Sequence, residues 1–509
     1  MSILPERQQA ELNKAVLQYL EPLVDEEFAL KISNVLKVPL EMVHGDSIIA
    51  NYLEKKWSTV LRLQRKILDL ETELSAAKEV LNSRPEESLE LAKSTGKSDW
   101  TPRLVASTMV TLASQRITAV QVHPVVPEIV TGCFNGTLLV WNMGSDNFHS
   151  GIPDKTIRAH TRSVNRIQIS PYPIDLSGGD ASKARDHLLA TCSADLSIKI
   201  YNASTYQHMG TLSGHEHTVS SVAFSIAKPG ILYSVSRDKA VKVWDIAKGI
   251  CIRTFVGHSD WVRDVDVAAV ARETTENQTS AGDFLLTCSN DLSVRLLHAQ
   301  SGTGLALLIG HTHVVERVKF LPLISNYILD KILLDNPDTF SSVPRDLISN
   351  PVYVSELGFK YCVTGGRDNI LKLWLLPPPV LKANRNPQPA VQNGSQGWHL
   401  ADMVGHLSWV KTIWVHPNGK FIFRAGDDKQ IKIWDLSTLE TGRILNVRTL
   451  NGHEGFVNDI ALAPYPAKLG LEGAALDETA FEQAMSALED KMRCIFVSGG
   501  LDSSLKVWS

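Results

Sequence analysis

The stretch from Gly214 to Asp245 constrains the fold more than any other part of the chain. It reads GHEHTVSSVAFS and, after a short break, ILYSVSRDKAVKVWD. In both runs apolar residues alternate with polar ones, which is typical of strands that bury one face of a sheet. An Asp marks the turn between the last two strands, and a Trp-Asp pair closes the unit. One such unit cannot bury both faces of its own sheet, so the number of copies decides the fold.

Seven copies of this unit follow one another along the chain. The residues that close them are Trp141, Tyr201, Trp244, Leu297, Trp374, Trp434 and Trp508. Six residues before each closing residue stand Asn135, Asp195, Asp238, Asp291, Asp368, Asp428 and Asp502. Ten residues before it stand Thr131, Thr191, Ser234, Thr287, Thr364, Arg424 and Ser498. The histidines that open the copies are His160, His215, His258, His311, His406 and His453. Seven such copies predict an all-β, seven-bladed propeller of the WD-repeat type.

In propellers of this type the recurring polar residues form a hydrogen-bonded chain inside each blade. In the third copy we expect Asp238 to accept from His215, and Ser234 to join the ring of His215 to the indole N–H of Trp244. Buried polar groups need such partners. The fold therefore accounts for these residues, and we expect no metal site, catalytic site or cofactor among them.

Composition narrows the classes of partner. A net charge of −4 gives no basic excess for bulk binding of nucleic acid. The chain has no run of 18 apolar residues and no signal-peptide core in MSILPERQQ, so we expect a soluble, intracellular protein without membrane insertion.

No cysteine forms a CxxC pair, which predicts buried, reduced thiols. The cysteines are Cys133, Cys192, Cys251, Cys288, Cys362 and Cys494.

Two short helices are expected at the start of the chain, over residues 6–20 and 26–36. The first carries an apolar stripe that includes Leu12, Val16 and Leu20. Two helices of this length cannot bury a core alone. Residues 1–41 are therefore expected to pair with a second chain.

Residues 53–82 carry a strict heptad pattern on one long helix. The core positions are Val60, Leu63, Ile67, Leu70, Leu74, Ala77 and Leu81. This pattern predicts a parallel, two-stranded coiled coil and hence a homodimer. The alternative is a helix packed on its own propeller.

Residues 83–103 are expected to form a linker, since they combine many charges with Pro and Gly. The propeller then occupies residues 104–509. The chain ends one residue after Trp508, so the seventh blade lacks an outer strand. The spare strand, residues 104–112, is expected to complete that blade and close the ring.

Five insertions lengthen the blades, and in four-stranded antiparallel blades all five open on the same face. They are residues 171–186, 268–283, 321–360, 376–402 and 464–492. The opposite face, called here the short-loop face, consists of the loops after the histidines and the turns around the Asp residues. A preformed face with short loops is the more usual docking platform of a propeller.

Cations and indoles gather on the short-loop face of an otherwise slightly acidic chain. On copies three to six they are Arg237, Lys239, Trp261, Arg263, Arg367, Trp409, Lys411 and Lys429. Copy seven adds Phe456. Trp beside Arg is typical of protein interfaces, and the charge implies an acidic partner. In the alternative interpretation the Trp rings cap the central channel and the cations are only solvated.

The order of the segments, with two short helices, a coiled coil, a linker and a propeller, resembles one family across essentially the whole chain. Four stretches carry the most specific resemblance. They are YLEKKWSTVLRLQRKILDLETEL (52–74), SRDKAVKVWD (236–245), GHSDWVRDV (257–265) and GHLSWVK (405–411). The chain resembles the lissencephaly/nuclear-distribution family of cytoplasmic dynein regulators, in which residues 1–41 would be a LisH dimerisation motif. Pro22-Leu23-Val24 stands where the motif has its usual Gly. The insertions point to a fungal member.

The resemblance implies a non-enzymatic homodimer that binds the motor domain of the cytoplasmic dynein heavy chain. It also implies a NudE-type coiled-coil adaptor, a place at microtubule plus ends and the spindle pole in the cytoplasm, and a role in nuclear migration. The contact with the motor would fall on Arg237, Arg263, Arg367, Trp409 and Lys429. Further contacts on the same face would be Lys239, Trp261, Lys411 and Phe456.

Two other functions compete with this one. A LisH/WD-repeat scaffold of a transcriptional corepressor should carry a basic nuclear-import run, and the segment from Lys382 to Arg385 is too short for one. An enzyme should carry a catalytic motif, and the sequence contains no P-loop, no GxSxG and no zinc-spaced His/Cys set.

Overall fold

The computed structural model describes most of the propeller and part of the N-terminal region. The described residues are 13–14, 16–17, 19–20, 24–36, 38, 102, 105–110, 115–174, 186–268, 282–350, 352–355, 357–382, 385–390, 396–405, 408–462 and 494–508. The chain divides into two compact units, Met1–Ser98 and Asp99–Ser509. The predicted coiled coil (53–82), Leu12, His406 and the insertion 464–492 lie outside the described residues.

In the first unit, helix α2 (Glu26–Leu36) has the predicted bounds. Asn13 Nδ2 donates to the carbonyl of Leu36 at 3.2 Å and so ties the preceding segment to the end of this helix. The predicted stripe missed Leu17, which is fully buried, whereas Val16 and Leu20 are half-buried. The stripe was defined by the helical spacing of Leu12, Val16 and Leu20. Leu17 is the residue after Val16 and lies beside that stripe, so the spacing did not include it.

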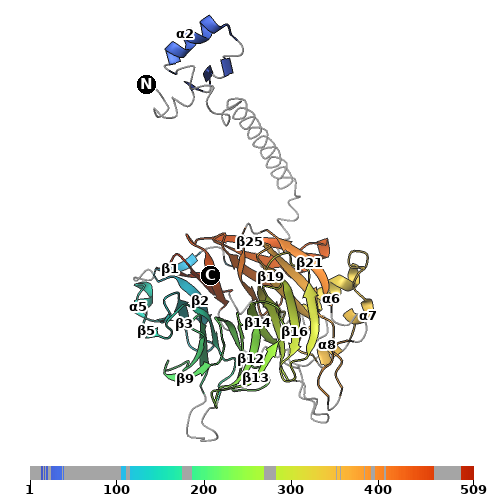
Figure 1. The fold of residues 1–509 in the computed structure, drawn as a ribbon. Helices are drawn as coiled ribbons and strands as arrows, with labels where there is room; N and C mark the ends of the chain where they lie inside the picture. The colour runs from blue at the N-terminus through green and yellow to red at the C-terminus, as the bar shows by residue number, and fades with distance from the viewer. Residues whose placement is uncertain are drawn as a thin grey trace, which may run out of the picture. The chain divides into compact units, whose positions relative to one another are not determined.

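The second unit is the seven-bladed propeller that the repeats predict, with seven four-stranded antiparallel sheets (Figure 1). Blades one to three contain β2 (Ile117–Val122) to β5 (Lys155–Arg158), β6 (Val164–Ile169) to β9 (His208–Ser213) and β10 (Val219–Phe224) to β13 (Ile250–Val256). Blades four to six contain β14 (Val262–Ala268) to β17 (Gly304–Ile309), β18 (Val315–Phe320) to β21 (Trp398–Val404) and β22 (Val410–Val415) to β25 (Leu445–Asn451).

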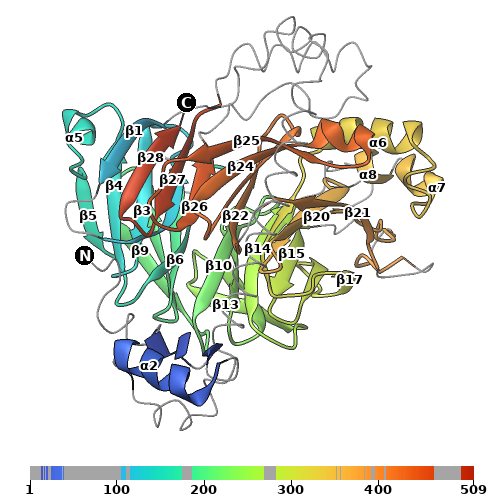
Figure 2. The same ribbon diagram turned by 90° about the horizontal axis from the view of Figure 1, so that it is seen from above.

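The seventh blade joins the two ends of the propeller sequence. Its strands are β26 (Val457–Leu462), β27 (Phe496–Gly500) and β28 (Ser504–Trp508), with β1 (Val105–Val110) as the fourth. β1 pairs antiparallel with β28, from Val105 opposite Trp508 to Val110 opposite Ser504. In Figure 2 the blue β1 lies beside the red β28. The pairing closes the ring, so the last blade has four strands like the others.

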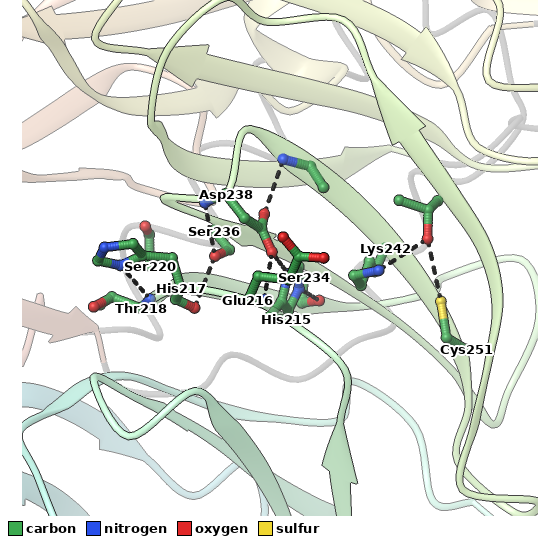
Figure 3. Close-up of polar contacts among 12 residues, drawn as sticks. His215, Glu216, His217, Thr218, Ser220, Ser234, Ser236, Asp238, Lys242 and Cys251 are labelled. Carbon is green, nitrogen blue, oxygen red and sulfur yellow. Dashed lines mark hydrogen bonds and ion pairs between the residues drawn. The ribbon is translucent and has the colours of Figure 1, made fainter.

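The predicted chain of hydrogen bonds is complete in the third blade, and Figure 3 shows its members His215, Ser234 and Asp238. His215 Nδ1 lies 2.7 Å from Asp238 Oδ2, and His215 Nε2 lies 2.6 Å from Ser234 Oγ. The indole Nε1 of Trp244 donates to the same hydroxyl at 2.7 Å. Every polar atom along this buried line therefore has a partner, as a low-dielectric interior requires.

The same network recurs around the ring with local changes. Histidine, acid and hydroxyl are joined in blades two, four, five and seven, through His160, His258, His311 and His453. Blades five and seven also have the Trp bond. Blade one lacks the histidine, and there Thr137 Oγ1 bonds both Asn135 and Gln115. Tyr201 and Leu297 close blades two and four without an indole.

Each Asp of the network also holds the turn in which it lies. Asp238 accepts the backbone N–H of Ala240 at 3.0 Å and that of Glu216 at 3.0 Å. Burial raises the pKa of this carboxyl, but the hydrogen bonds from His215 and from the two backbone groups outweigh it and lower the pKa to about 2. The ionised carboxylate is therefore the form that the fold stabilises.

The sixth blade departs from the pattern because Arg424 occupies the hydroxyl position. Its side chain is fully buried, and none of its three guanidinium nitrogens has a hydrogen-bond partner in the described part of the blade. The indole Nε1 of Trp434 is likewise unpaired there. Burial lowers the pKa of Arg424 to about 9, opposed by the charges of Asp428 and Asp368. A buried cation without hydrogen bonds is a cost to the fold.

One buried carboxylate makes polar contacts with the first strands of both adjacent blades and of one blade beyond them. Asp459 Oδ1 accepts from Arg166 Nη1 at 2.9 Å and from Thr412 Oγ1 at 2.9 Å, and Asp459 Oδ2 accepts from the N–H of Val120 at 3.1 Å. These partners belong to β6, β22 and β2. One buried carboxylate on β26 therefore joins the first strands of four blades.

The insertion 321–360 is folded and belongs to the core. It contains α6 (Ile324–Asp335), α7 (Arg345–Ile348) and α8 (Val352–Ser355), which lie together at one side of the propeller (Figures 1 and 2). Leu329 and Leu333 of α6 are buried in one continuous cluster with the strands of blades five and six. The buried Lys360 Nζ contacts Asp330 Oδ1 at 2.5 Å and the carbonyl of Ile348 at 2.7 Å.

The predicted bounds of the insertion 376–402 were wrong at the C-terminal end, since β21 begins at Trp398. The alternation of this strand is weak because it lies at the outer edge, where both faces are partly exposed. All six cysteines are unpaired, as predicted, and five of them are buried. Burial raises the pKa of Cys133 to about 11 and that of Cys494 to about 12, so these thiols stay protonated and unreactive.

The depressed pKa of Asp238 predicts how stability depends on acid. A folded-state pKa of about 2, below the ordinary 3.8, contributes stability that is present above pH 3.8 and is lost as pH falls toward 2. Asp195 has the same shift and adds to the effect. The urea midpoint of the wild type should therefore fall between about pH 5 and pH 2, and Asp238→Asn should flatten this fall and lower stability by about 1–3 kcal/mol near neutrality. Asp338→Asn, at an exposed position, should leave the pH curve unchanged.

A second prediction concerns two of the buried cations, Arg424 and Lys360. Arg424→Met keeps the volume and removes an unpaired charge, so it should raise the free energy of unfolding by about 1–4 kcal/mol. Lys360→Met removes a paired cation and leaves the part-buried Asp330 with the hydroxyl of Tyr361 but without its counter-ion, so it should lower that free energy. Urea unfolding of both variants measures the difference. Equal losses in the two variants would contradict the assignment of Arg424 as an unpaired charge.

Candidate protein-binding face

A backbone irregularity recurs on the short-loop face in all seven blades. The first strand of each blade has a β-bulge after its first residue, and one extra residue is left unpaired. A bulge turns the side chain of the extra residue away from the regular alternation. The bulged residues are Thr118, Asn165, Ser220, Arg263, Glu316, Lys411 and Asn458. Two of them, Arg263 and Lys411, are among the predicted contact residues.

Trp261 is the centre of a first group of contacts, in blades three and four. Its ring carries the guanidinium of Arg263 at 3.6 Å and that of Arg237 at 5.0 Å from the centroid. The indole Nε1 donates to Ser220 Oγ at 2.5 Å, which fixes the plane of the ring. Arg263 Nε in turn donates to Asn290 Oδ1 at 2.6 Å. The guanidinium of Arg263 is thus held in position before any partner arrives, while that of the exposed Arg237 lies over the same ring.

Trp409 is the centre of a second group, in blades five and six. The guanidinium of Arg367 lies 4.4 Å and Lys411 Nζ lies 5.7 Å from its ring centroid. The ring remains 41% exposed. A partly exposed indole between two cations is the composition of an interface hot spot.

Glu316 joins the two groups, and the sequence did not single it out. Its Oε1 accepts from Arg367 Nε at 2.5 Å, and its Oε2 lies 3.7 Å from Arg263 Nη1. Glu316 is the bulged residue of β18. When the seven copies are aligned on the first residue of their first strands, Glu316 occupies the same position in its copy as Arg263 and Lys411 do in theirs. We call Trp261, Trp409, Arg237, Arg263, Arg367, Lys411 and Glu316 the Trp–Arg cluster.

The carboxylates of the cluster only partly neutralise it. Lys411 Nζ lies 3.8 Å from Asp427 Oδ2, and burial raises the pKa of Asp427 despite the nearby lysine. Burial also lowers the pKa of Arg263, against the charge of Glu316. The interpretation that the cations are only solvated is therefore wrong for Arg263, Arg367 and Lys411, which contact rings and carboxylates.

The other predicted face residues lie outside these contacts. Lys239 and Lys429 follow their turn Asp residues and have φ angles of 69° and 66°, a left-handed geometry that projects both side chains into solvent. Among the described residues neither lysine forms a salt bridge. Phe456 lies on blade seven and is 42% exposed. The structure thus brings together the Trp, Arg and Lys411 members and leaves these three residues apart.

This arrangement is suited to binding carboxylates rather than to catalysis. The fixed guanidinium groups offer N–H donors in the planar geometry that matches a carboxylate. In the described part of the chain no group of three or more His, Cys, Asp or Glu side chains could hold a metal ion. Among the same residues no helix is long and apolar enough to cross a membrane.

Comparison with known proteins agrees with the repeats. The family described as "WD domain, G-beta repeat" matches residues 206–245, 249–297 and 397–435. The chain is 51% identical to "Nuclear distribution protein PAC1" of Scheffersomyces stipitis over 523 residues, covering 100% of this chain and 99% of the relative. It is 50% identical to the protein of the same name in Debaryomyces hansenii, with 100% and 99% covered. The Komagataella phaffii protein of that name is 34% identical, with 99% and 97% covered.

The position of Glu316 predicts the effect of removing its charge. Glu316→Gln leaves Arg263 and Arg367 without their shared counter-ion in a partly buried place, so the free energy of unfolding should fall by about 1–3 kcal/mol. Glu454→Gln is the matched control, since Glu454 is exposed on the same face. Chemical denaturation measures both. A loss in the control as large as in Glu316→Gln would show that the bridge contributes nothing specific.

Proposed function

This chain belongs to the fungal PAC1 family of nuclear distribution proteins, and from that premise we propose that its propeller binds the motor domain of the cytoplasmic dynein heavy chain through the Trp–Arg cluster. One observation carries the proposal: two indoles each carry two cations on one face of a chain with net charge −4. Such a local excess of positive charge selects an acidic surface and speeds encounter with it.

The contact residues that we propose are Arg237, Arg263, Arg367, Trp409 and Lys429, with Lys239, Trp261, Lys411 and Phe456 as further contacts on the face. The two lysines outside the cluster carry no salt bridge among the described residues, so they bind acidic groups without first losing a partner. Arg263 and Arg367 share Glu316 and can exchange part of that bridge for a carboxylate of the motor. Positioned guanidinium groups lose less entropy on binding than free ones.

We propose that the protein acts as a homodimer through a LisH-like motif in residues 1–41 and a coiled coil in residues 53–82. In the first unit Phe28 is 59% and Val35 80% exposed, about two turns apart on α2. Apolar residues in this position support burial against a second copy. A dimer carries two propellers, so the second contact with a motor gains from effective concentration, by as much as about 10²–10⁴.

Binding of this kind regulates the motor without chemistry. The propeller and the family point to a scaffold-type protein rather than an enzyme. A face that binds one state of the motor better than another shifts the motor toward that state by the difference in affinity. We place this regulation in the cytoplasm, at microtubule plus ends and the spindle pole, with a NudE-type adaptor, in nuclear migration and spindle positioning. A corepressor scaffold is the competing function, and the acidic partner would then be nuclear.

The decisive experiment measures binding of the full-length dimer to a monomeric dynein motor domain. Arg263→Ala with Trp409→Ala should weaken binding at least about 100-fold, because two hot-spot side chains are lost. Arg253→Ala, an exposed arginine on the outer strand β13, is the matched control and should bind like the wild type. Circular dichroism checks that all three are folded.

The outcomes separate partner from site. Tight binding that survives the double substitution would keep the motor as partner and move the site away from the Trp–Arg cluster. No binding by the folded wild type would remove the dynein proposal and favour the corepressor.

A further inference from the structure

The half of the short-loop face that the Trp–Arg cluster does not use has its own pattern. On blades one and two, apolar and basic side chains alternate along the rim, and all are exposed. We call Arg116, Phe134, Arg162 and Leu196 the basic-apolar arc; Phe456 of blade seven, already proposed as a contact with the motor, is not part of it. Phe134 is 59% and Leu196 is 39% exposed. A single exposed apolar side chain is ordinary on a protein surface, but apolar side chains that share one rim with exposed arginines are typical of a site that a partner covers.

The loops that carry the arc are tied to one another through the backbone. The N–H of Phe134 donates to the carbonyl of Arg116 at 2.9 Å, and the N–H of His160 donates to Gly136 at 2.9 Å. Gly136 has a φ of 86°, and a Cβ there would lie 2.2 Å from the carbonyl oxygen of His160. The turn of Phe134 therefore lies directly against the loop that carries Arg162.

On this half of the ring, bulged side chains form hydrogen bonds to the backbone of the next blade. Asn458 Nδ2 donates to the carbonyl of Ile117 at 2.6 Å, and Thr118 Oγ1 donates to that of Val164 at 2.6 Å. Each bond runs from one blade to the first strand of the next. In blades four to six the bulged side chains join the Trp–Arg cluster instead. The arc is thus a rigid, preformed surface.

Leu196 adds an argument from the backbone. It follows the turn Asp of blade two and has a φ of 72°. Glycine and asparagine adopt this geometry easily, and blades one and five have Gly136 and Asn369 in the equivalent place. A leucine there carries both backbone strain and exposed apolar surface. A contact with a partner would cover that apolar surface, whereas the strain is shared by Leu292 of blade four and does not single out the arc.

The charges of the arc identify the kind of partner. Arg116 and Arg162 are exposed, and neither forms a salt bridge with a described carboxylate. Asp195 and Asp502 are engaged in their blade networks. Among the described residues of these loops only Glu454, on the neighbouring blade seven, offers an exposed carboxylate. The exposed side chains of the arc itself therefore carry two positive charges beside apolar surface.

We propose that the basic-apolar arc is a second binding site, separate from the Trp–Arg cluster, that takes an acidic amphipathic segment of a partner protein. The apolar side of such a segment covers Phe134 and Leu196, and its carboxylates pair with Arg116 and Arg162. The two sites lie on different blades of one face, so both are occupied at the same time. This inference does not depend on the motor as partner of the Trp–Arg cluster.

The test uses a fluorescent synthetic peptide of about 15 residues, the length at which a helix becomes marginally stable in water, with Glu on one face and Leu on the other. The full-length wild type should bind it, and a Lys-for-Glu version of the peptide should not bind. Phe134→Ser with Leu196→Asn should weaken binding about 10- to 100-fold, the loss of two buried apolar contacts.

The matched control is Leu292→Asn. Leu292 has the same turn position in blade four, a φ of 68° and 38% exposure, but it lies outside the arc. It should bind the peptide like the wild type, and thermal unfolding checks that both variants fold. The proposal is overturned if the wild type does not bind, or if Leu292→Asn or Trp409→Ala weakens binding while the arc variant does not. It is also overturned if saturating motor domain displaces the peptide.

Discussion

The pairing of β1 with β28 is the constraint on which the rest of the molecule depends. A ring of open sheets has no stable edge until the last blade receives a fourth strand, and that strand comes from the opposite end of the propeller sequence. The seven blades therefore fold to completion only together. The contacts of Asp459 also hold the ring together, since this one carboxylate on the seventh blade reaches three other blades.

Inside the blades, the polar side chains stabilise the fold, and the residues available for binding a partner lie on the loops. Histidine, hydroxyl and carboxylate, which elsewhere form catalytic sites, here satisfy one another and stay buried. What remains for recognition is a set of side chains on bulges and turns whose backbone the same Asp residues hold in place. These Asp residues therefore stabilise the blade and also fix the backbone of the turns, while other side chains on those turns make the contacts with a partner.

The sequence predicted the propeller, its strands and α2 because their signals are local: alternation, turn residues and helical periodicity. It also placed Arg263 and Trp409 on one face, since the topology of a blade decides where each loop opens. Glu316 was missed because it acts by pairing with Arg263 and Arg367, which lie in other segments of the chain. The residue type at a bulge varies from blade to blade, so Glu316 alone does not mark the bulge that turns its side chain toward them. The helices α6 to α8 were missed because a repeat pattern says nothing of what fills an insertion. Their burial depends on a surface that blades five and six make only after folding.

The seven bulges also separate two kinds of position along each first strand. The regular residues point into the space between blades, where a change of volume is felt at once. The bulged residue belongs to the same strand but packs in no core, and among the seven are threonine, asparagine, arginine, glutamate and lysine. A propeller built in this way can acquire a new recognition surface by single substitutions around one rim. Its scaffold keeps the same side chains throughout, so specificity can diverge between relatives while the architecture stays constant.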